Sequence, residues 1–329
     1  MNETVYRPLG SPQPLVSVII PAYNRQAYIS DAIDSVLAQD YPHTELIVVD
    51  DGSTDGTVAT VERYGDRLTL LQQANRGANA ARNAGARASA GDYLVFLDSD
   101  DWLSPDALSA HIATAHRWPE AAILCTAARS IGADGTLGPV RVSNWPRVPS
   151  APLKLFMLES PPFPACEMYR REVFDQFGGF DEDSESSDEG ETRLRIVLSG
   201  HLVVRTEGGY AVYRPVANSV TKNVLPLHRY KVRSLSRLRR DYATVNAYAD
   251  ELLRRRLSAL RLRYWNSFLT FHLSLNPAEI SKFLYHLVRI SKADPGYIRF
   301  LVAETPWKAS RRSTTGTDAQ YSSDTEYLE

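Results

Sequence analysis

Three aspartates follow an apolar run in the middle of the chain. The run Tyr93-Leu94-Val95-Phe96-Leu97 leads directly into Asp98-Ser99-Asp100-Asp101. Such a run is typical of a parallel strand buried on both faces, and open α/β sheets bind ligands at the carboxyl ends of these strands. Carboxylates this close repel one another, so a bound cation would stabilise them. The stretch provides only a few carboxylate oxygens as metal ligands. We therefore expect Mg²⁺ or Mn²⁺, which would be bound together with the phosphates of a substrate.

The same acidic stretch has a simpler interpretation. Asp101 is suited to cap a turn that enters a helix near Pro105. Capping accounts for one carboxylate and not for three, so the cation site is the favoured interpretation.

A second acidic stretch also follows a short apolar run. Residues 45–49 are mostly β-branched or leucine and lead into Asp50-Asp51-Gly52-Ser53. In dinucleotide-binding folds, an acidic side chain after the second strand holds a ribose hydroxyl. A plain turn capped by Ser53 is the alternative for this stretch taken alone.

The loop after the first expected strand excludes two common nucleotide sites. Residues 15–20 form a β-branched run that Pro21-Ala22-Tyr23-Asn24 ends, without the G-x-G-x-x-G that cradles a pyrophosphate. The chain also has no P-loop sequence. A nucleotide whose phosphates are neutralised by a metal fits these residues better.

Strands and helices alternate through the first part of the chain. This alternation predicts a Rossmann-like, doubly wound and mostly parallel sheet with right-handed crossovers. The expected strands are residues 15–20, 45–49, 68–72, 93–97 and 121–127, and the expected helices are 29–37, 58–64, about 78–86 and 106–118. Two further short strands are expected at residues 202–204 and 211–214.

Arg82 lies on the expected helix that begins near Ala78, in a segment of small and polar residues. An arginine near a helix start can meet a phosphate or a nucleobase carbonyl. The alternative is a surface arginine on an alanine-rich helix.

Four of these segments, in the same order, resemble the family 2 glycosyltransferases. They are residues 18–24, 48–55, 75–83 and 96–101, and the resemblance extends from about Leu15 to Thr221. It implies a GT-A fold, a nucleotide-diphosphate sugar donor and inversion at the anomeric carbon. It also implies that Asp98 and Asp100 are a D-x-D pair, with Asp100 the more direct metal ligand. The donor-nucleotide residues that it implies are Pro21, Ala22, Tyr23, Asn24, Asp50, Asp51, Arg82, Asp98 and Ser99.

The catalytic base is expected shortly after a turn that resembles the family's G-G-F-D-E. Gly178–Glu182 form this turn, and Asp188-Glu189 stand where the family has Glu-Asp, in reversed order. An inverting transfer needs one carboxylate to take the proton of the acceptor hydroxyl, and Glu189 occupies that position. A solvated acidic loop ahead of a helix is the alternative.

The sequence gives fewer signals for the residues that would contact the acceptor. Arg195 matches the family's arginine on the next helix, and Trp102 and Glu167 are further candidates. The family's histidine before Ser219-x-Thr221 is missing, with Val216 and Ala217 in that area, so the metal is left with fewer protein ligands or with water.

Composition indicates a globular protein in a reducing compartment. Hydrophobic residues make up 43% and charged residues 23% of the 329 residues, and the net charge of −2 argues against general nucleic-acid binding. Two cysteines without zinc spacing do not favour a structural metal or a disulfide framework. Residues 1–14 lack the pattern of a signal peptide, so a cytoplasmic location is expected, with peripheral contact at the inner face of the cell membrane.

Beyond Thr221 the chain becomes basic. Residues 222–263 hold twelve Lys and Arg and three acids, and apolar residues keep helical spacing from Leu253 onward. A solvated face, attraction to anionic lipid and pairing into a homodimer all remain open. The expected domains are a flexible segment 1–14, a GT-A domain 15–221, a helical domain 222–308 and a disordered tail 309–329.

These observations lead to one favoured function and two alternatives. The favoured function is a metal-dependent glycosyltransferase that uses a UDP-sugar, with dTDP- or GDP-sugars open, and a saccharide or lipid-linked saccharide acceptor in cell-surface polysaccharide synthesis. A degenerate glycan-binding module is one alternative. A sugar-nucleotide pyrophosphorylase is the other, although it would need a Gly-rich, basic first loop that Pro21–Asn24 do not provide.

Overall fold

The computed structural model describes most of the chain up to residue 258. The described residues are 13–132, 134–142, 145–151, 164–183, 190–216, 224–242 and 249–258, with the backbone alone for 224–229. The chain divides into two compact units, Met1–Ser274 and Leu275–Glu329, and every described residue lies in the first. The domain boundaries expected from the sequence stay predictions.

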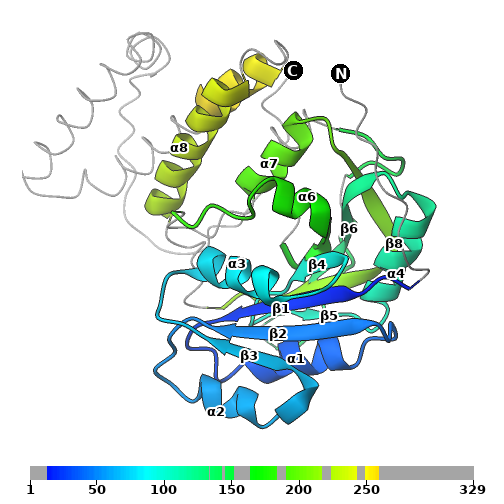
Figure 1. The fold of residues 1–329 in the computed structure, drawn as a ribbon, viewed down its shortest axis with the longest axis vertical. Coiled ribbons are helices and arrows are strands. Elements are labelled where there is room, and N and C mark those ends of the chain that lie inside the picture. The colour runs from blue at the N-terminus through cyan, green and yellow to red at the C-terminus, as the bar shows by residue number, and fades with distance from the viewer. Residues whose placement is uncertain are drawn as a thin grey trace, which may run out of the picture. The chain divides into compact units, whose positions relative to one another are not determined.

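One eight-stranded sheet organises the described residues, in the order β3-β2-β1-β4-β7-β6-β8-β5 (Figure 1). The pairs β1–β2, β1–β4, β2–β3 and β6–β8 are parallel, and β4–β7, β6–β7 and β5–β8 are antiparallel. The α/β class and the mostly parallel sheet are therefore confirmed. The strands are β1 (Val16–Ala22), β2 (Thr44–Asp50), β3 (Thr69–Gln72), β4 (Tyr93–Phe96), β5 (Trp102–Leu103), β6 (Ala121–Ser130), β7 (Glu167–Arg170) and β8 (Leu202–Tyr213).

Helices cover both faces of the parallel half of the sheet, as its apolar strands predict. The helix α3 (Ala78–Ala88) packs on β1 and β2 from one side, and α1 (Ile29–Leu37) and α2 (Thr57–Glu62) pack on the other (Figure 1). Gly85 allows this close approach, since a Cβ there would lie 2.4 Å from Cγ2 of Ile19. The contact fixes Arg82, one turn earlier on α3, relative to the sheet.

The mixed half of the sheet differs from expectation. No strand is expected at β7 or β5, and β8 is expected as two short strands. In β7 the signal is hidden by Glu167, a buried carboxylate whose Oε1 lies 2.8 Å from Nε of Arg193. In β8 the pairing with β6 continues across a bulge at Gly208-Gly209, between the pairs Cys125–Arg205 and Ala127–Tyr210. The helix α4 (Ala107–Arg117) packs against β8.

An aromatic cluster joins the sheet to the turn after α6 (Arg171–Gln176). The ring of Phe180 lies 4.7 Å from that of Phe96 in β4 and 5.1 Å from that of Phe174 in α6, in edge-to-face contacts. Tyr169 of β7 packs edge-on against the same rings. Such contacts add to ordinary apolar burial. They anchor the Gly178–Glu182 turn beside β4.

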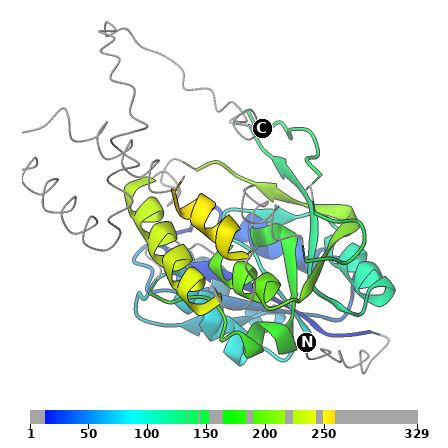
Figure 2. The same ribbon diagram turned by 90° about the horizontal axis from the view of Figure 1, so that it is seen from above.

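The C-terminal part of the described chain is helical. The helix α8 (Val224–Tyr242) lies beside α7 (Gly190–Leu198), and residues 249–258 form a further helix (Figure 2). Leu235 and Leu238 of α8 are buried, as are Leu253 and Leu257. The helical prediction is confirmed for these residues, while 259–308 lie outside the described part. None of the described helices combines the length and the apolar character that crossing a membrane requires. Two short 3₁₀ helices complete the fold, η1 (Gly65–Arg67) and η2 (Pro164–Cys166).

Candidate functional site

The two acidic strand ends lie at one edge of the sheet, as expected. Ala22, at the end of β1, pairs with Asp50 at the end of β2. On the other side of β1, Ile19 pairs with Phe96 of β4, which Asp98 follows two residues later. Parallel strands place their carboxyl ends together, so the loops after β1, β2 and β4 form one site.

Asp51 holds the loop that leads into α3. Its buried carboxylate accepts hydrogen bonds from Nε2 of Gln73 at 2.8 Å and from the backbone N–H groups of Arg76 at 2.9 Å and Gly77 at 2.8 Å. Its own N–H donates to the carbonyl of Ala22. Three donors on one carboxylate make a strong, charge-assisted anchor. Asp51 thus shapes the site by fixing the backbone around residue 76.

Asp50 keeps part of its hydrogen-bonding capacity free. Its Oδ2 accepts the N–H of Ser53 at 3.1 Å, whereas its buried Oδ1 has no hydrogen-bond partner among the residues that the structure describes. Buried polar atoms are nearly always paired, so this oxygen has capacity to accept a hydrogen bond from a ligand. Asn24 faces the same loop, with φ of 52°, and its Oδ1 accepts the N–H of Thr54 at 2.8 Å.

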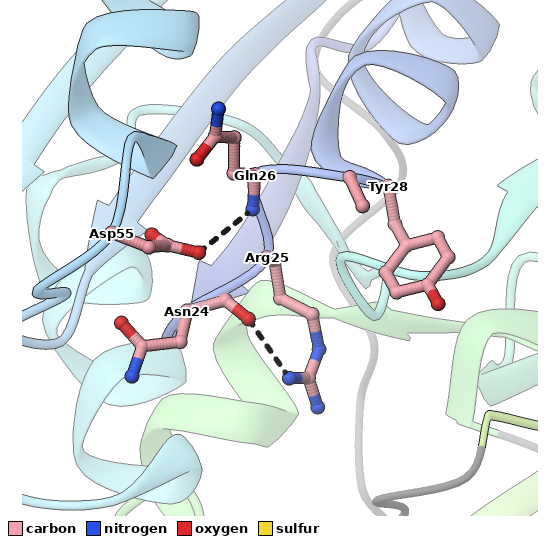
Figure 3. Close-up of a pocket in the computed structure, with 6 residues that line it drawn as sticks. Asn24, Arg25, Gln26, Tyr28 and Asp55 are labelled. Atoms are coloured by element: carbon pink, nitrogen blue, oxygen red, sulfur yellow. Dashed lines mark hydrogen bonds between the residues drawn. The ribbon is translucent and has the colours of Figure 1, made fainter.

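A pocket of about 350 Å³ opens beside this loop (Figure 3). Gln26 donates its N–H to Oδ2 of Asp55 at 3.3 Å, and Arg25 donates from Nη1 to the carbonyl of Asn24 at 3.2 Å. Only Asn24 of the lining residues was expected from the sequence, while the expected Tyr23 is 45% exposed just outside. The lining residues are Asn24, Arg25, Gln26, Ala27, Tyr28 and Asp55.

Burial and mutual repulsion disfavour the charged forms in the acidic cluster. Burial raises the pKa of Asp100, and the charge of Asp98 adds to this, while Arg25 partly opposes it. Burial raises the pKa of Asp101 well above its usual range, again with a contribution from Asp98. Ser99, which stands between Asp98 and Asp100 in the chain, is also buried. A bound cation would offset both effects and favour the charged carboxylates.

Two arginines at this cluster were not identified from the sequence. Nε of Arg25 lies 3.5 Å from Oδ2 of Asp100. Arg214 donates its N–H to Oδ1 of Asp101 at 2.9 Å, and its guanidinium lies over the ring of Trp102, 4.9 Å from the centroid. Arg25 directly follows the expected loop residues, so its position in the sequence was an available signal. Arg214 is far along the chain and gave none.

Arg82 reaches the same cluster from α3, while its expected contact with a phosphate or a nucleobase stays a prediction. Its Nη2 donates to Oδ1 of Asp98 at 2.6 Å, and its Nη1 donates to Oδ1 of Asn79 at 2.9 Å. The guanidinium is thus already held by two side chains at the edge of the site.

The cluster suits a divalent cation that is shared with a phosphate ligand. In the described part of the chain, no three side chains of His, Cys, Asp or Glu come together as a metal-binding group. A cation carried by phosphates, however, needs only one or two protein carboxylates. Asp98, whose side chain is 34% exposed, and Asp100, at 16%, offer two such oxygen donors.

Residues 17–178 match the family model described as glycosyl transferase family 2. They belong to that family. A 100-residue segment is 46% identical to a putative teichuronic acid biosynthesis glycosyltransferase, TuaG, from Bacillus subtilis. The segment is 29% of this chain and 40% of that relative, so the chain covers less than half of the relative's length.

Solved structures show that this family 2 domain has the expected GT-A fold. The structure of S. aureus TarS 1-349 in complex with UDP-GlcNAc is similar with a TM-score of 0.60 at 20% identity, over 78% of this chain and 73% of that one. Mannosyltransferase PcManGT from Pyrobaculum calidifontis, in complex with GDP-Man and Mn²⁺, gives 0.53 at 19% identity, over 88% and 84%.

The candidates on the acceptor side fall partly beyond the family 2 match. Asp188 and Glu189 lie outside the described residues. Arg195 donates to the carbonyls of Phe177 and Gly179, the latter at 2.8 Å, and thus holds the turn. Glu167 is fully buried and ion-paired with Arg193, so a direct acceptor contact would require that pair to open. Acceptor roles for Trp102, Glu167 and Arg195 stay predictions.

Proposed function

We propose that this chain is an inverting, metal-dependent glycosyltransferase that moves a sugar from a UDP-sugar to a hydroxyl of a saccharide or lipid-linked saccharide acceptor. The observation that carries the proposal is the acidic cluster at the end of β4, within a family 2 domain. It lies at the same edge of the sheet as Asp50, whose Oδ1 is unpaired among the described residues. The product we propose is a cell-surface polysaccharide, in keeping with the name of the relative TuaG.

The loops after β1 and β2 are suited to the nucleoside. Oδ1 of Asp50, buried and without a partner in the described part of the chain, would accept a hydrogen bond from a ribose hydroxyl or a base N–H. Asn24 contacts the loop after Asp50 through the N–H of Thr54, Ala22 pairs with Asp50 at the end of β1, and Asp51 keeps the neighbouring loop in place. We assign Pro21 and Tyr23 to the same nucleoside site. The UDP-GlcNAc complex of TarS supports uridine, and the GDP-Man complex of PcManGT makes guanosine the competitor in any test.

Asp98 and Asp100 would hold Mn²⁺ or Mg²⁺, and Ser99 and Arg82 lie beside them. When bound, the metal would neutralise the departing diphosphate, so no protein acid is needed. Two observations support this assignment: the burial and mutual repulsion of the clustered carboxylates, which a cation would relieve, and the Mn²⁺ complex of PcManGT. Arg82 orients the Asp98 carboxylate through its 2.6 Å hydrogen bond.

The transfer is a single displacement. The acceptor oxygen forms a bond to the anomeric carbon while the bond to the diphosphate oxygen breaks, and the acceptor proton passes to Glu189. Glu189 lies outside the described residues, so this role rests on its position after the Gly178–Glu182 turn.

A substitution of Glu189 tests the assignment. With Mn²⁺ and UDP-sugars, Glu189→Gln should lower UDP release by about 10²- to 10⁴-fold, the usual contribution of a general base. The increase in melting temperature that UDP with Mn²⁺ causes should not change. Asp188→Asn is the matched control and should stay active. If Asp188→Asn lost UDP release while Glu189→Gln kept it, the catalytic base would be Asp188. If the wild-type protein bound UDP but released no UDP from any UDP-sugar, the non-catalytic glycan-binding module would be favoured.

Location and assembly complete the proposal. We place the protein in the cytoplasm, at the inner face of the membrane, where the basic C-terminal region would meet anionic lipid, and we keep a homodimer as its oligomeric state. The basic residues of α8 support the lipid contact.

A further inference from the structure

The helix α8 is tied to the end of the Gly178–Glu182 turn by one arginine. Nη2 of Arg237 lies 2.6 Å from Oδ2 of Asp181 and 3.3 Å from Oε1 of Glu191. The hydroxyl of Tyr230, also on α8, donates to the same Oδ2 of Asp181 at 3.2 Å. Glu191 is buried and also accepts a hydrogen bond from Nε of Arg195 at 3.0 Å, so Arg237 is the second cation at this carboxylate.

From Asp181 a line of hydrogen bonds continues to the acidic cluster. The backbone carbonyl of Asp181 accepts Nδ2 of Asn79 at 3.0 Å. Oδ1 of Asn79 accepts Nη1 of Arg82 at 2.9 Å, and Nη2 of Arg82 donates to Oδ1 of Asp98 at 2.6 Å. We call this set, Arg237–Asp181–Asn79–Arg82–Asp98, the relay.

The inner part of the relay is well enclosed. Asn79 and Arg82 are each 2% exposed, whereas Arg237 is 39% exposed on its side chain. Hydrogen bonds in such enclosed surroundings are stronger than in water, and members of a connected chain depend on one another. The orientation of Arg82 on Asp98 is therefore set in part by the position of Asp181.

Asp181 has support from the α3 side as well. Asn83 of α3 donates to the carbonyl of Phe180 at 2.9 Å and accepts its N–H at 3.0 Å, and Arg76 pairs with Glu182 at 2.8 Å. The turn should thus survive the loss of Arg237 but lose its exact placement against Asn79.

We propose that α8, which lies beyond the family 2 match, is a positioning element of the donor site, and that Arg237 orients the metal-binding Asp98 through the relay. This rests on the proposed function, in which Asp98 faces the metal and the diphosphate. Arg237 touches no substrate and is a positioning residue. Figure 2 shows α8 running along the side of α7.

The test compares two arginines of the same helix. Arg237→Gln removes the first member of the relay, and Arg239→Gln removes a similar ion pair, since Nε of Arg239 lies 2.7 Å from Oδ1 of Asp250. Titration calorimetry with UDP and Mn²⁺ should show about tenfold weaker binding in Arg237→Gln, the lower end of the effect of outer-shell partners on metal sites. Arg239→Gln should bind within about twofold of the wild type, and Arg237→Lys should recover part of the loss.

A second substitution shows whether the effect travels through the relay. Asn79→Ala breaks it in the middle, so adding Arg237→Gln to that variant should weaken UDP–Mn²⁺ binding no further. Independent, additive losses, or equal affinities of Arg237→Gln and Arg239→Gln, would overturn the proposal.

The two failures can be told apart. A wild-type protein that binds neither UDP nor another nucleotide with Mn²⁺ refutes the proposed function and, with it, the donor-site role of α8. A wild-type protein that binds UDP, with variants that differ from it only in melting temperature, refutes the role of the relay and leaves the proposed function intact.

Discussion

Arg82 and Asp98 share a hydrogen bond of 2.6 Å, although the two side chains stand in very different surroundings. The side chain of Arg82 is 3% exposed, and that of Asp98 is 34% exposed. The buried cation depends on this carboxylate, whereas the carboxylate still faces outward. One oxygen of Asp98 therefore stabilises the fold while the residue remains accessible to a ligand.

This asymmetry predicts different effects of neutralising the two carboxylates of the D-x-D pair. Asp98→Asn removes the anion that accepts the 2.6 Å hydrogen bond of the buried Arg82 guanidinium. The free energy of unfolding should fall by about 1 to 3 kcal/mol, less than for a fully buried pair. Asp100→Asn loses only a 3.5 Å pair with the partly exposed Arg25, so we expect a change within about 1 kcal/mol. Urea unfolding without metal measures both values.

In the presence of Mn²⁺, both variants should lose UDP binding. Equal stabilities of the two variants would contradict the anchoring role of Asp98. UDP binding that survives in both would remove the metal from this cluster.

The sequence identified the acidic residues of the site but not their cationic partners. Asp50 and Asp98 were found because each follows an apolar strand, and parallel strands end at the same edge. Arg214 meets Asp101 across 113 positions of the chain, through the pairing of β5 with β8. A two-residue strand such as β5 carries no periodic signal, so a contact that depends on it cannot be read from local patterns.

The turn at Gly178-Gly179 offers a matched pair of substitutions. Both glycines have left-handed backbones, with φ of 70° and 73°, so alanine should cost about 1 kcal/mol at either position. At Gly179 the new Cβ would also lie 2.6 Å from Oδ1 of Asn83, whereas at Gly178 nothing lies within 4 Å. Asn83 holds Phe180 by two hydrogen bonds, so Gly179→Ala should lose about 1 to 2 kcal/mol more than Gly178→Ala.

Chemical unfolding of the two alanine variants, side by side, measures this difference. If Gly178→Ala proved the more damaging of the two, the contact between the turn and α3 would be unimportant for stability.

The strands of the parallel half were predictable and those of the mixed half were less so. In β1 and β2, the continuous run of apolar residues predicts a strand that is buried on both faces. In β7, burial is achieved by the Glu167–Arg193 ion pair, with the hydroxyl of Tyr169 also donating to Glu167. Charged residues at strand positions hide a strand from any analysis based on apolar pattern.

His111 predicts one component of the pH dependence of stability. Its Nδ1 lies 3.0 Å from Oγ1 of Thr206, between α4 and β8, and burial lowers its pKa from 6.5 to about 3. Below pH 6.5 His111 is therefore protonated in the unfolded chain but stays neutral in the folded chain until the pH approaches 3. The free energy of unfolding falls as the pH decreases through this range. From pH 7 to pH 5 this one group should lower the free energy of unfolding by about 2 kcal/mol.

His111→Asn isolates this component because asparagine can keep a polar contact with Thr206. The variant should lose less stability than the wild type between pH 7 and pH 5. Parallel pH profiles of unfolding for the two proteins would show that His111 does not cause the change.

Thermal unfolding with nucleotides is the most direct measurement of the donor site. At about 100 times the dissociation constant, UDP with Mn²⁺ should add about 2.7 kcal/mol of stability, or roughly 5 to 10 °C in melting temperature. We predict this shift with UDP and a UDP-sugar in the presence of Mn²⁺, and little or none with UDP alone or in Asp100→Asn. If no UDP, dTDP or GDP compound shifts the melting temperature with metal, the chain has no nucleotide-sugar donor site.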